Sequence, residues 1–363
     1  MTRKRPTDDP TSGKSTAEGN SRKSSEESRG FLAEIVGDEN LRGQRMQAGA
    51  ILDLMDVVAG RSAHQHAESS VVTLSFDRVE LVRPIVHLDL VRLEGQVVNV
   101  GRSSIMVEVD VTRQDPQTRD FVPIQRSYIT MVAVDGERRP NRDIPALALG
   151  SDAERARNAD ALAHKARAAE WEEIQAGITL PSAGNPPALN VSAIEDPLNR
   201  EKRDFLTPGE TSVTVRRIFM PRNLNVLGTI FGGDILLWMD RVATYTARLF
   251  TRNHHMVTLA MNRIVFRQPI FASDLVEMTA RVVYVRRYTL TVEIEVTLLR
   301  ADGSKVPSHS GAFTVLNYDE SGFKRPIVTG LRLTPGDPEG LLRYHLARLR
   351  SEFWRGHRKS GEA

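Results

Sequence analysis

The chain has 363 residues, a formal net charge of +3 and no cysteine. This length leaves room for two domains that each bury a core of their own. The lack of cysteine excludes disulfide bonds, a thiolate nucleophile and Cys-ligated zinc or iron–sulfur clusters. Basic and acidic residues are interspersed, so the composition favours an ordinary solvated surface and no nucleic-acid partner.

Neither a membrane span nor a targeting peptide is expected from the sequence. No run of about 18 apolar residues occurs. The N-terminus carries acidic residues and lacks the apolar segment of a secretory signal. Together with the absence of cysteine, these features favour a cytoplasmic protein.

The first half of the chain is predicted to contain a tail and one domain. Residues 1–30 are rich in Ser, Lys, Arg, Glu and Thr, and we expect a disordered tail because they cannot bury enough apolar area to fold. Residues 31–150 are interpreted as the first domain, with a helix from Gly49 to about His66 in which apolar residues recur on one face. Runs rich in β-branched residues, separated by turn residues, predict strands at 70–81, 88–100, 104–113 and 124–134.

The second half follows the same plan after a connecting segment. Residues 151–200 are predicted to be a helix and a Pro-rich linker, 201–335 the second domain, and 336–363 a C-terminal helix and tail. The predicted elements are helices at 151–176, from Gly233 to about Thr251 and at 341–354, and strands at 211–219, 256–266, 275–285, 289–299 and 311–318.

The two halves repeat each other at an offset of 185 residues, which slips to 184 only around the first long helix. A repeat this long indicates two whole domains, because solenoid repeats run roughly 20–50 residues. The repeated positions are Asn40, Gly43, Gly49, Asp56 and Val72-Thr73 in the first half, and Asn225, Gly228, Gly233, Asp240 and Val257-Thr258 in the second.

The repeated residue types carry chemistry more often than packing. Glycines before a helix leave backbone N–H groups accessible at the positive end of the helix dipole, where an oxyanion is stabilised. An Asp two turns into the helix can act as general base or nucleophile, and the upstream Asn can orient a substrate or water. Each feature alone has a structural interpretation as a turn, a solvated helix residue or a close-packing glycine. Their recurrence at nearly equal spacing favours the functional interpretation.

These motifs resemble a known family. The segment from Asn225 to Asp240 is similar to the signature of hotdog-fold acyl-CoA thioesterases, and residues 40–134 resemble the same domain with Gln44–Ala48 replacing the usual Thr-Ile-Phe-Gly. Over residues 31–350 the chain resembles the tandem double-hotdog acyl-CoA hydrolases, most closely the mitochondrial-type branch. The resemblance implies an α+β fold of two tandem hotdog domains. Each would have a long central helix wrapped by an antiparallel sheet, and the two would pair into one double hotdog with active sites at their seam.

The resemblance also implies an activity and a set of site residues. The reaction is hydrolysis of fatty acyl-CoA to free acid and CoA, without cofactor or metal, in a homotrimer of double hotdogs. Hotdog pairing would combine Asn40 with Asp240, and Asn225 with Asp56. Because the phosphates of CoA favour Arg and backbone donors, the residues expected to bind substrate are Gly43, Gly49, Gly228, Gly232, Gly233, Arg102, Ser103, Ser104 and Arg287.

Two other functions remain open at this point. A hydratase or dehydratase acting on acyl thioesters would pair Asp with a nearby catalytic His, but the His nearest to Asp56 is His64, about two turns away. A non-catalytic acyl-CoA binding or sensor module would need neither the Asn nor the Asp residues. No Gly-x-Ser-x-Gly nucleophile elbow is present, which disfavours the α/β-hydrolase route to thioester cleavage.

Overall fold

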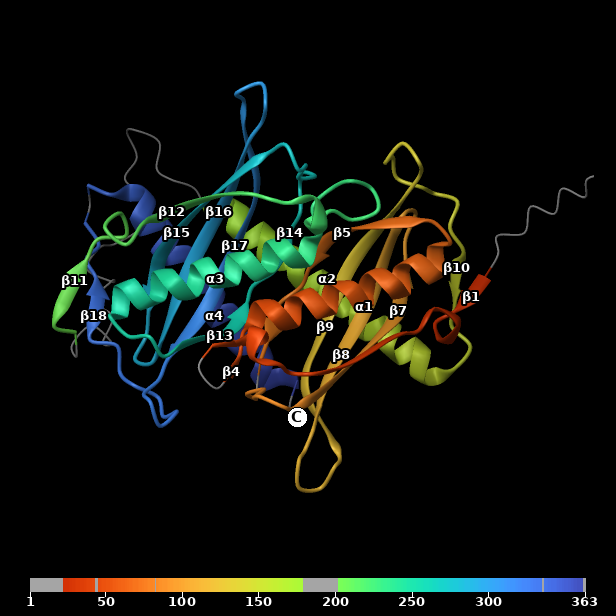
Figure 1. Ribbon diagram of the computed structural model, residues 1–363, viewed down its shortest axis with the longest axis horizontal. Coiled ribbons are helices and arrows are strands. Elements are labelled where there is room, and N and C mark those ends of the chain that lie inside the picture. The colour runs from red at the N-terminus through yellow and green to blue at the C-terminus, as the bar shows by residue number, and fades with distance from the viewer. Residues whose placement is uncertain (1–21, 43–44, 82, 179–201, 335, 362–363) are drawn as a thin grey trace, which may run out of the picture.

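The computed structural model describes residues 22–42, 45–81, 83–178, 202–334 and 336–361. Each half of the chain contributes one long helix and five strands of a six-stranded antiparallel sheet, and the sixth strand of each sheet comes from the other half. The predicted α+β class, with a central helix against an antiparallel sheet in each half, is confirmed (Figure 1). No helix in these described ranges combines the length and the apolar composition that crossing a membrane requires.

The first half contains the predicted helix and strands within a few residues. Helix α1 spans Ala48–Ala67 and packs its apolar side chains against the sheet. The sheet order is β14-β5-β9-β8-β7-β2. The strands of this half are β2 Gly30–Ile35, β5 Ser70–Phe76, β6 Val79–Glu80, β7 Leu90–Val100, β8 Ser104–Gln114 and β9 Phe121–Val134.

The second half repeats this arrangement around α3, Gly232–Thr251, in the order β12-β15-β16-β17-β13-β6. The strands are β12 Val213–Ile218, β13 Met256–Met261, β14 Ile264–Val265, β15 Leu275–Val285, β16 Thr289–Leu299 and β17 Lys305–Asn317. Strand β17 begins at Lys305, earlier than the predicted Gly311. The first residues of β17 are polar and include Pro307, so the sequence does not show the pattern of a strand there. In the structure Pro307 pairs with Thr297, and a register shift between Val296 and Thr297 accommodates the proline.

The two halves exchange short strands across their seam. Strand β6 of the first half pairs with β13 of the second, and β14 of the second pairs with β5 of the first. Side chains follow the same exchange: Arg78 donates to Asn262 Oδ1 at 2.8 Å, and Arg263 donates to Asp77 Oδ1 at 3.1 Å. Because these four residues are two repeat-related pairs, the seam is stabilised twice by equivalent contacts.

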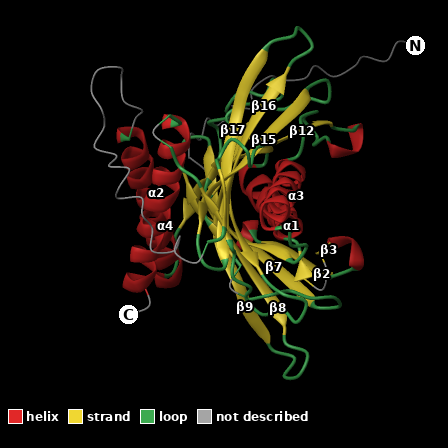
Figure 2. Ribbon diagram, turned by 90° about the vertical axis from the view of Figure 1, so that its left-hand side faces the viewer, coloured by secondary structure: helices red, strands yellow, loops and turns green. Residues whose placement is uncertain are grey.

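Two further helices lie on the side of the sheets opposite α1 and α3 (Figure 2). Helix α2, Asp152–Gly177, begins with a capping box formed by Ser151 and Glu154. Helix α4, Pro338–Gly361, contacts α2 through Phe353, whose ring centroid lies 5.6 Å from that of Trp171. The predicted linker falls in residues 179–201, outside the described residues, and the proposed domain limits stay predictions.

Short strands complete the described structure. They pair in parallel as β1 Arg22–Ser24 with β10 Ala146–Ala148 and as β11 Asp204–Leu206 with β18 Thr329–Leu331, and antiparallel as β3 Leu41–Arg42 with β4 Arg45–Met46.

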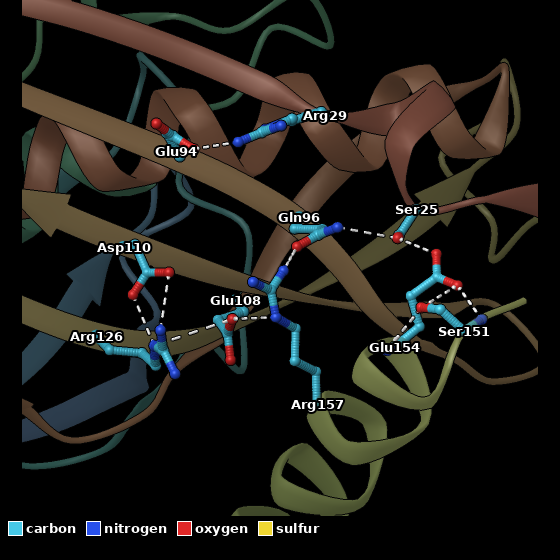
Figure 3. A network of polar contacts seen from close by, with 10 residues as sticks. All are labelled: Ser25, Arg29, Glu94, Gln96, Glu108, Asp110, Arg126, Ser151, Glu154 and Arg157. Atoms are coloured by element: carbon cyan, nitrogen blue, oxygen red, sulfur yellow. Dashed lines mark hydrogen bonds and ion pairs between the residues drawn. The ribbon is translucent and has the colours of Figure 1, made fainter. Parts of the chain in front are cut away.

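The expectation of disorder throughout residues 1–30 is wrong for residues 22–30. The hydroxyl of Ser25 donates to Glu154 Oε1 on α2 at 2.9 Å and accepts from Gln96 Nε2 on β7 at 3.0 Å (Figure 3). Ser28 is fully buried and its hydroxyl lies 2.9 Å from His66 Nδ1 on α1. This segment is held by hydrogen bonds of small polar side chains, which hydrophobic composition does not reveal. Residues 1–21 lie outside the described residues.

Candidate active site

The N-terminus of each central helix meets the predicted Asp of the other helix. The Gly233 N–H at the start of α3 donates to Asp56 Oδ2 at 2.8 Å, and the Gly49 N–H at the start of α1 donates to Asp240 Oδ2 at 3.0 Å. Asp56 is 0% exposed and Asp240 1% exposed. The structure therefore brings each predicted glycine together with a predicted Asp from the opposite half of the chain.

The glycines make this contact possible. A Cβ atom at Gly49 would lie 2.7 Å from Leu237 Cα, and one at Gly233 would lie 2.9 Å from Asp53 Cα, both far closer than real Cβ contacts. The N-terminal halves of α1 and α3 thus pack antiparallel, and at Gly49 and Gly233 the two backbones are too close for a side chain between them. The positive ends of the two helix dipoles lie against carboxylates, which favours their ionised form.

We name the two centres by their carboxylates. The Asp56 centre is Asp56, Thr73 and Gly233. The Asp240 centre is Asp240 and Gly49, to which we assign Thr258 because it is the repeat equivalent of Thr73. In the Asp56 centre the Thr73 hydroxyl donates to Asp56 Oδ1 at 2.7 Å, so both carboxylate oxygens accept hydrogen bonds. Two more carboxylates, Asp53 and Asp234, lie close enough to Asp56 to raise its pKa.

Burial dominates the electrostatics of the Asp56 centre. Removal from water raises the pKa of Asp56 to about 7, against the lowering effect of the Thr73 and Gly233 hydrogen bonds, while Asp53 and Asp234 raise it further. Burial and then repulsion from Asp234 raise the pKa of Asp53 to about 6. This centre therefore disfavours additional negative charge.

The Asp240 centre lies against a cavity. Thr258, the repeat equivalent of Thr73, is 2% exposed, and its hydroxyl has no hydrogen-bond partner in the described part of the chain. Thr258 lines a cavity of about 620 Å³, together with Met46 and Ile51, which flank the start of α1. This cavity thus approaches the helix end that binds Asp240.

The cavity is strongly basic. Its lining combines both halves of the chain and α4, and contains one acidic side chain, Glu80, which pairs with Arg78. Arg45 is fixed by a hydrogen bond to Gly322 O and by stacking on Tyr318, with its Cζ 4.7 Å from the ring centroid. The basic side chains of the lining are Arg45, Arg78, Arg83, Arg286, Lys324, Arg350 and Arg355.

The pairing of Asn40 with Asp240 and of Asn225 with Asp56 stays a prediction, because the recorded hydrogen bonds of Asn225 lie within its own loop. The Asn225 carboxamide oxygen accepts from the N–H groups of Leu227 and Thr229, at 3.0 and 3.2 Å, and its Nδ2 donates to Thr229 Oγ1 at 2.9 Å. Its recorded hydrogen bonds thus hold its own loop, in which Gly228 has a positive φ of 71° that favours glycine. The backbone of Asn40 lies in a 3-10 turn at Asp38–Asn40, and Gly43 lies outside the described residues.

The other predicted binding residues are divided between the centres and the surface. Gly232 lies at the Asp56 centre, where a Cβ would come 3.0 Å from Asp56 Oδ2. Arg102 and Ser103 lie in the turn between β7 and β8, Ser104 is the first residue of β8, and none of the three lines either of the two cavities described here. In the equivalent turn of the second half Arg286 lines the basic cavity, whereas Arg287 is exposed and stacks on Tyr288.

Neither His64 nor His66 belongs to the Asp56 centre or the Asp240 centre. His64 Nδ1 lies 2.9 Å from Ser69 O beyond the far end of α1. His66 is fully buried, with Ser28 Oγ on one side and Pro145 O on the other. Within the described residues no three His, Asp or Glu side chains converge as metal ligands would.

The sequence analysis did not predict Thr73 and Thr258 as site residues, nor any of the basic side chains that line the cavity. The recurrence of Thr73 as Thr258 at the common offset of 185 was visible, and it could have marked both as site residues. The basic residues of the cavity come from separate strands and α4, so no sequence spacing connects them.

Comparison with known proteins finds a similarity in each half of the chain. The family described as the thioesterase superfamily matches residues 46–119 and 227–300. Over 318 residues the chain is 24% identical to acyl-coenzyme A thioesterase 11 of Mus musculus, covering 86% of this chain and 50% of that protein. It is 35% identical over 92 residues to an uncharacterized acyl-CoA thioester hydrolase of Bacillus subtilis (strain 168), covering 25% of this chain and 54% of that protein.

A solved structure is also similar to part of the chain. It is an acyl-CoA hydrolase from Staphylococcus aureus in complex with butyryl coenzyme A, coenzyme A and coenzyme A disulfide, with 28% identity and a TM-score of 0.39. The alignment covers 42% of this chain and 96% of that one. This chain spans about half the length of the curated full-length relatives that it matches.

Proposed function

We propose that this chain, which belongs to the thioesterase superfamily with two copies of its domain in tandem, hydrolyses fatty acyl-CoA to free fatty acid and CoA. The observation that carries the proposal is a buried Asp240 carboxylate held at the N-terminus of the opposing helix, beside a cationic cavity. The relatives with thioesterase names support the same reaction class.

The cavity suits the CoA part of the substrate. CoA carries several phosphate charges, and a cavity lined by seven basic side chains and one acidic side chain attracts such a ligand. Its volume of about 620 Å³ is in the ordinary range for small-molecule sites, roughly 300–1,000 Å³. The acidic Asp53 and Asp234 make the Asp56 centre the less favourable of the two for an anionic substrate.

The chemistry at the Asp240 centre needs a carboxylate, a water and a polarised carbonyl. Asp240 takes a proton from water, whose oxygen attacks the thioester carbon, with the Thr258 hydroxyl orienting the water. The partial positive charge at the start of α1 stabilises the developing oxyanion. The tetrahedral intermediate then collapses, the carbon–sulfur bond breaks, and the leaving CoA thiolate takes up the proton. Gly49 fixes the carboxylate through its N–H.

Asp240 could serve in this scheme as base or as nucleophile, and isotope labelling identifies the nucleophile when its anhydride is hydrolysed at the aspartyl carbon. A base delivers solvent oxygen to the acid in the first turnover, so a single turnover in ¹⁸O water labels the product. A nucleophilic Asp240 forms a mixed anhydride with the acyl group. Hydrolysis of this anhydride at the acyl carbon places the label on the product, and hydrolysis at the aspartyl carbon places it on Asp240. Label on Asp240 under excess enzyme would identify the nucleophilic route.

The direct test of the proposal is release of free thiol from acyl-CoAs of graded chain length. The wild-type chain is expected to turn over at least one of them, and the Asp56→Asn, Asp240→Asn double variant none above background. Binding without thiol release would indicate the sensor module instead. Wild-type turnover by the double variant would show that neither carboxylate carries the reaction.

Assembly as a homotrimer is part of the same proposal. Large apolar side chains are more than half exposed on the end strands of both sheets and on α3, namely Phe31, Ile35, Ile218, Tyr245 and Leu249. Such exposure marks surfaces that associate. Light scattering at micromolar concentration should give three times the chain mass, and a single-chain mass would overturn this assembly. Cytoplasmic residence stays a prediction, to be tested by cell fractionation.

A further inference from the structure

A buried guanidinium without a carboxylate partner lies on α4. Arg350 is 9% exposed and lines both the 620 Å³ cavity and a second one of about 520 Å³ between α2, α4 and the sheet. Its Cζ lies 5.6 Å from the ring centroid of Trp171. Among the residues that the structure describes, no acidic side chain forms an ion pair with it.

The surroundings of Arg350 do not compensate its charge. Burial lowers the pKa of Arg350, and the nearby cation Arg78 lowers it further, whereas Glu293 has the opposite effect. Glu293 is itself engaged by Arg343. An ionised group removed from water without a partner is costly, so a protein that retains one commonly binds an anion there.

The position of Arg350 is set by the rest of α4. Arg343 forms ion pairs with Glu293 and Glu295 on β16, and Tyr344 packs edge-on against Tyr284 at 5.4 Å. These contacts fix the helix on the second sheet and hold Arg350 at the cavity wall. Helix α4 lies outside both segments that match the thioesterase superfamily.

We propose that Arg350 binds a phosphate group of the CoA moiety and thereby selects acyl thioesters of phosphorylated carriers over unphosphorylated ones. This inference rests on the proposed acyl-CoA hydrolysis and assigns part of its substrate specificity to a helix outside the two repeated domains. Arg350 is a binding residue in this role, remote from the reacting carbonyl.

The test compares two substrates with the same acyl group: the acyl-CoA, and the acyl thioester of N-acetylcysteamine, which has no phosphate. Arg350→Met keeps an unbranched apolar side chain against Trp171 and removes the charge. It should lower kcat/KM for acyl-CoA by about 10- to 100-fold, through KM, as expected for loss of one charge-assisted contact. The N-acetylcysteamine thioester should be hydrolysed within about twofold of the wild-type rate, and Arg350→Lys should restore part of the CoA preference.

Arg348→Met is the matched control, because Arg348 lies on the same helix, pairs with Glu352 and lines neither cavity. It should leave both substrates unchanged. Equal losses on both substrates with Arg350→Met, or equal losses for the two variants, would overturn the inference.

A binding measurement separates failure of this inference from failure of the proposed function. Adenosine 3′,5′-bisphosphate should raise the Tm of the wild-type chain and of Arg348→Met but not that of Arg350→Met, whether or not the wild type hydrolyses any thioester. Without ligand, the Tm of Arg350→Met should equal or exceed the wild-type value, because an uncompensated buried charge is removed. A lower Tm with unchanged ligand response would show that Arg350 only supports α2 and α4.

Discussion

The Asp56 and Asp240 centres share one backbone arrangement and differ in charge and access. In both, an Asp two turns into a helix accepts the N–H of a glycine at the start of the opposite helix. The Asp56 centre adds two acidic neighbours and a threonine that is already bonded to the carboxylate. The Asp240 centre adds a basic cavity and a threonine without a partner among the described residues. Duplication has thus kept the geometry while the surroundings diverged.

Two substitutions between the repeats account for much of this difference. Asp53 beside the Asp56 centre corresponds to Leu237 beside the Asp240 centre, and Asp234 corresponds to Ala50. Each replaces a carboxylate by an apolar side chain at an equivalent helix position. The Asp240 centre consequently lacks the repulsion that a polyanionic substrate would meet at the Asp56 centre. We therefore expect catalysis at Asp240 and mainly a structural role for Asp56.

The largest test of this comparison is the pair of single variants Asp240→Asn and Asp56→Asn. Loss of the catalytic carboxylate at the Asp240 centre should lower kcat/KM by about 10³-fold, whereas Asp56→Asn should lower it by less than about tenfold. Thiol release from a preferred acyl-CoA measures both. The opposite ranking would place the reaction at the Asp56 centre, and equal losses would mean that both centres turn over.

The threonines give the second test, since they occupy equivalent positions with different partners. Thr258→Val should lower kcat/KM by about tenfold, or roughly 1.4 kcal/mol, without lowering Tm, because its hydroxyl has no partner among the described residues to lose. Thr73→Val removes the donor to buried Asp56 and should lower Tm while leaving kcat/KM nearly unchanged. If the two variants behave alike in both assays, the functional difference between the centres does not exist.

Much of the fold followed from the sequence because its signals are local. The apolar periodicity of α1 and the alternation in β8 predict their elements without tertiary information. The resemblance predicted that each Asp faces the other half of the chain, but through Asn40 and Asn225. The contacts of Gly49 with Asp240 and of Gly233 with Asp56 were not predicted, since residues that are 191 and 177 positions apart have no local signal.

The errors have physical causes as well. The order of residues 22–30 depends on hydrogen bonds from Ser25 and Ser28 to distant segments, which composition does not encode. The expected contact of Arg102 with CoA stays a prediction, but the positions of Arg286, in the equivalent turn, and of Arg350, on α4, in the lining of the basic cavity were not predicted. Convergence of side chains from several elements is a tertiary property, so sequence spacing could not predict this lining.

The third prediction uses pH to examine the Asp56 centre alone. The pKa of Asp56 in the folded chain, about 7, lies above its unfolded value of about 3.9. Between these two pH values Asp56 is therefore protonated in the folded chain and ionised in the unfolded chain. The resulting stabilisation is complete below the unfolded pKa and is lost as pH rises through 7. Asp56→Asn has no carboxyl group that could lose this stabilisation. The Tm of the variant minus the Tm of the wild type should therefore be about 2–4 °C larger at pH 8 than at pH 5.

A surface carboxylate provides the control for that measurement. Asp110→Asn, which breaks the pair with Arg126, should change Tm by the same amount at both pH values. If Asp56 were the catalytic base, kcat/KM of the wild type would fall below pH 7 and this inflection would vanish with Asp56→Asn. An unchanged profile in the variant supports the structural role of Asp56.

The smallest effect on activity is expected from the N-terminal segment, which packs on the half that carries Asp56. Deleting residues 2–29 removes the Ser28 contact with His66 on α1 and the Ser25 contact with Glu154 on α2. Because each buried hydrogen bond contributes about 1 kcal/mol, Tm should fall by several degrees. The Asp240 centre does not include this segment, so kcat/KM at 25 °C should stay within about twofold.

Deleting only residues 2–21, which leaves these contacts in place, is the control and should preserve Tm. A loss of kcat/KM comparable to that of Asp240→Asn would show that the first half supports the chemistry directly and that the two centres are coupled.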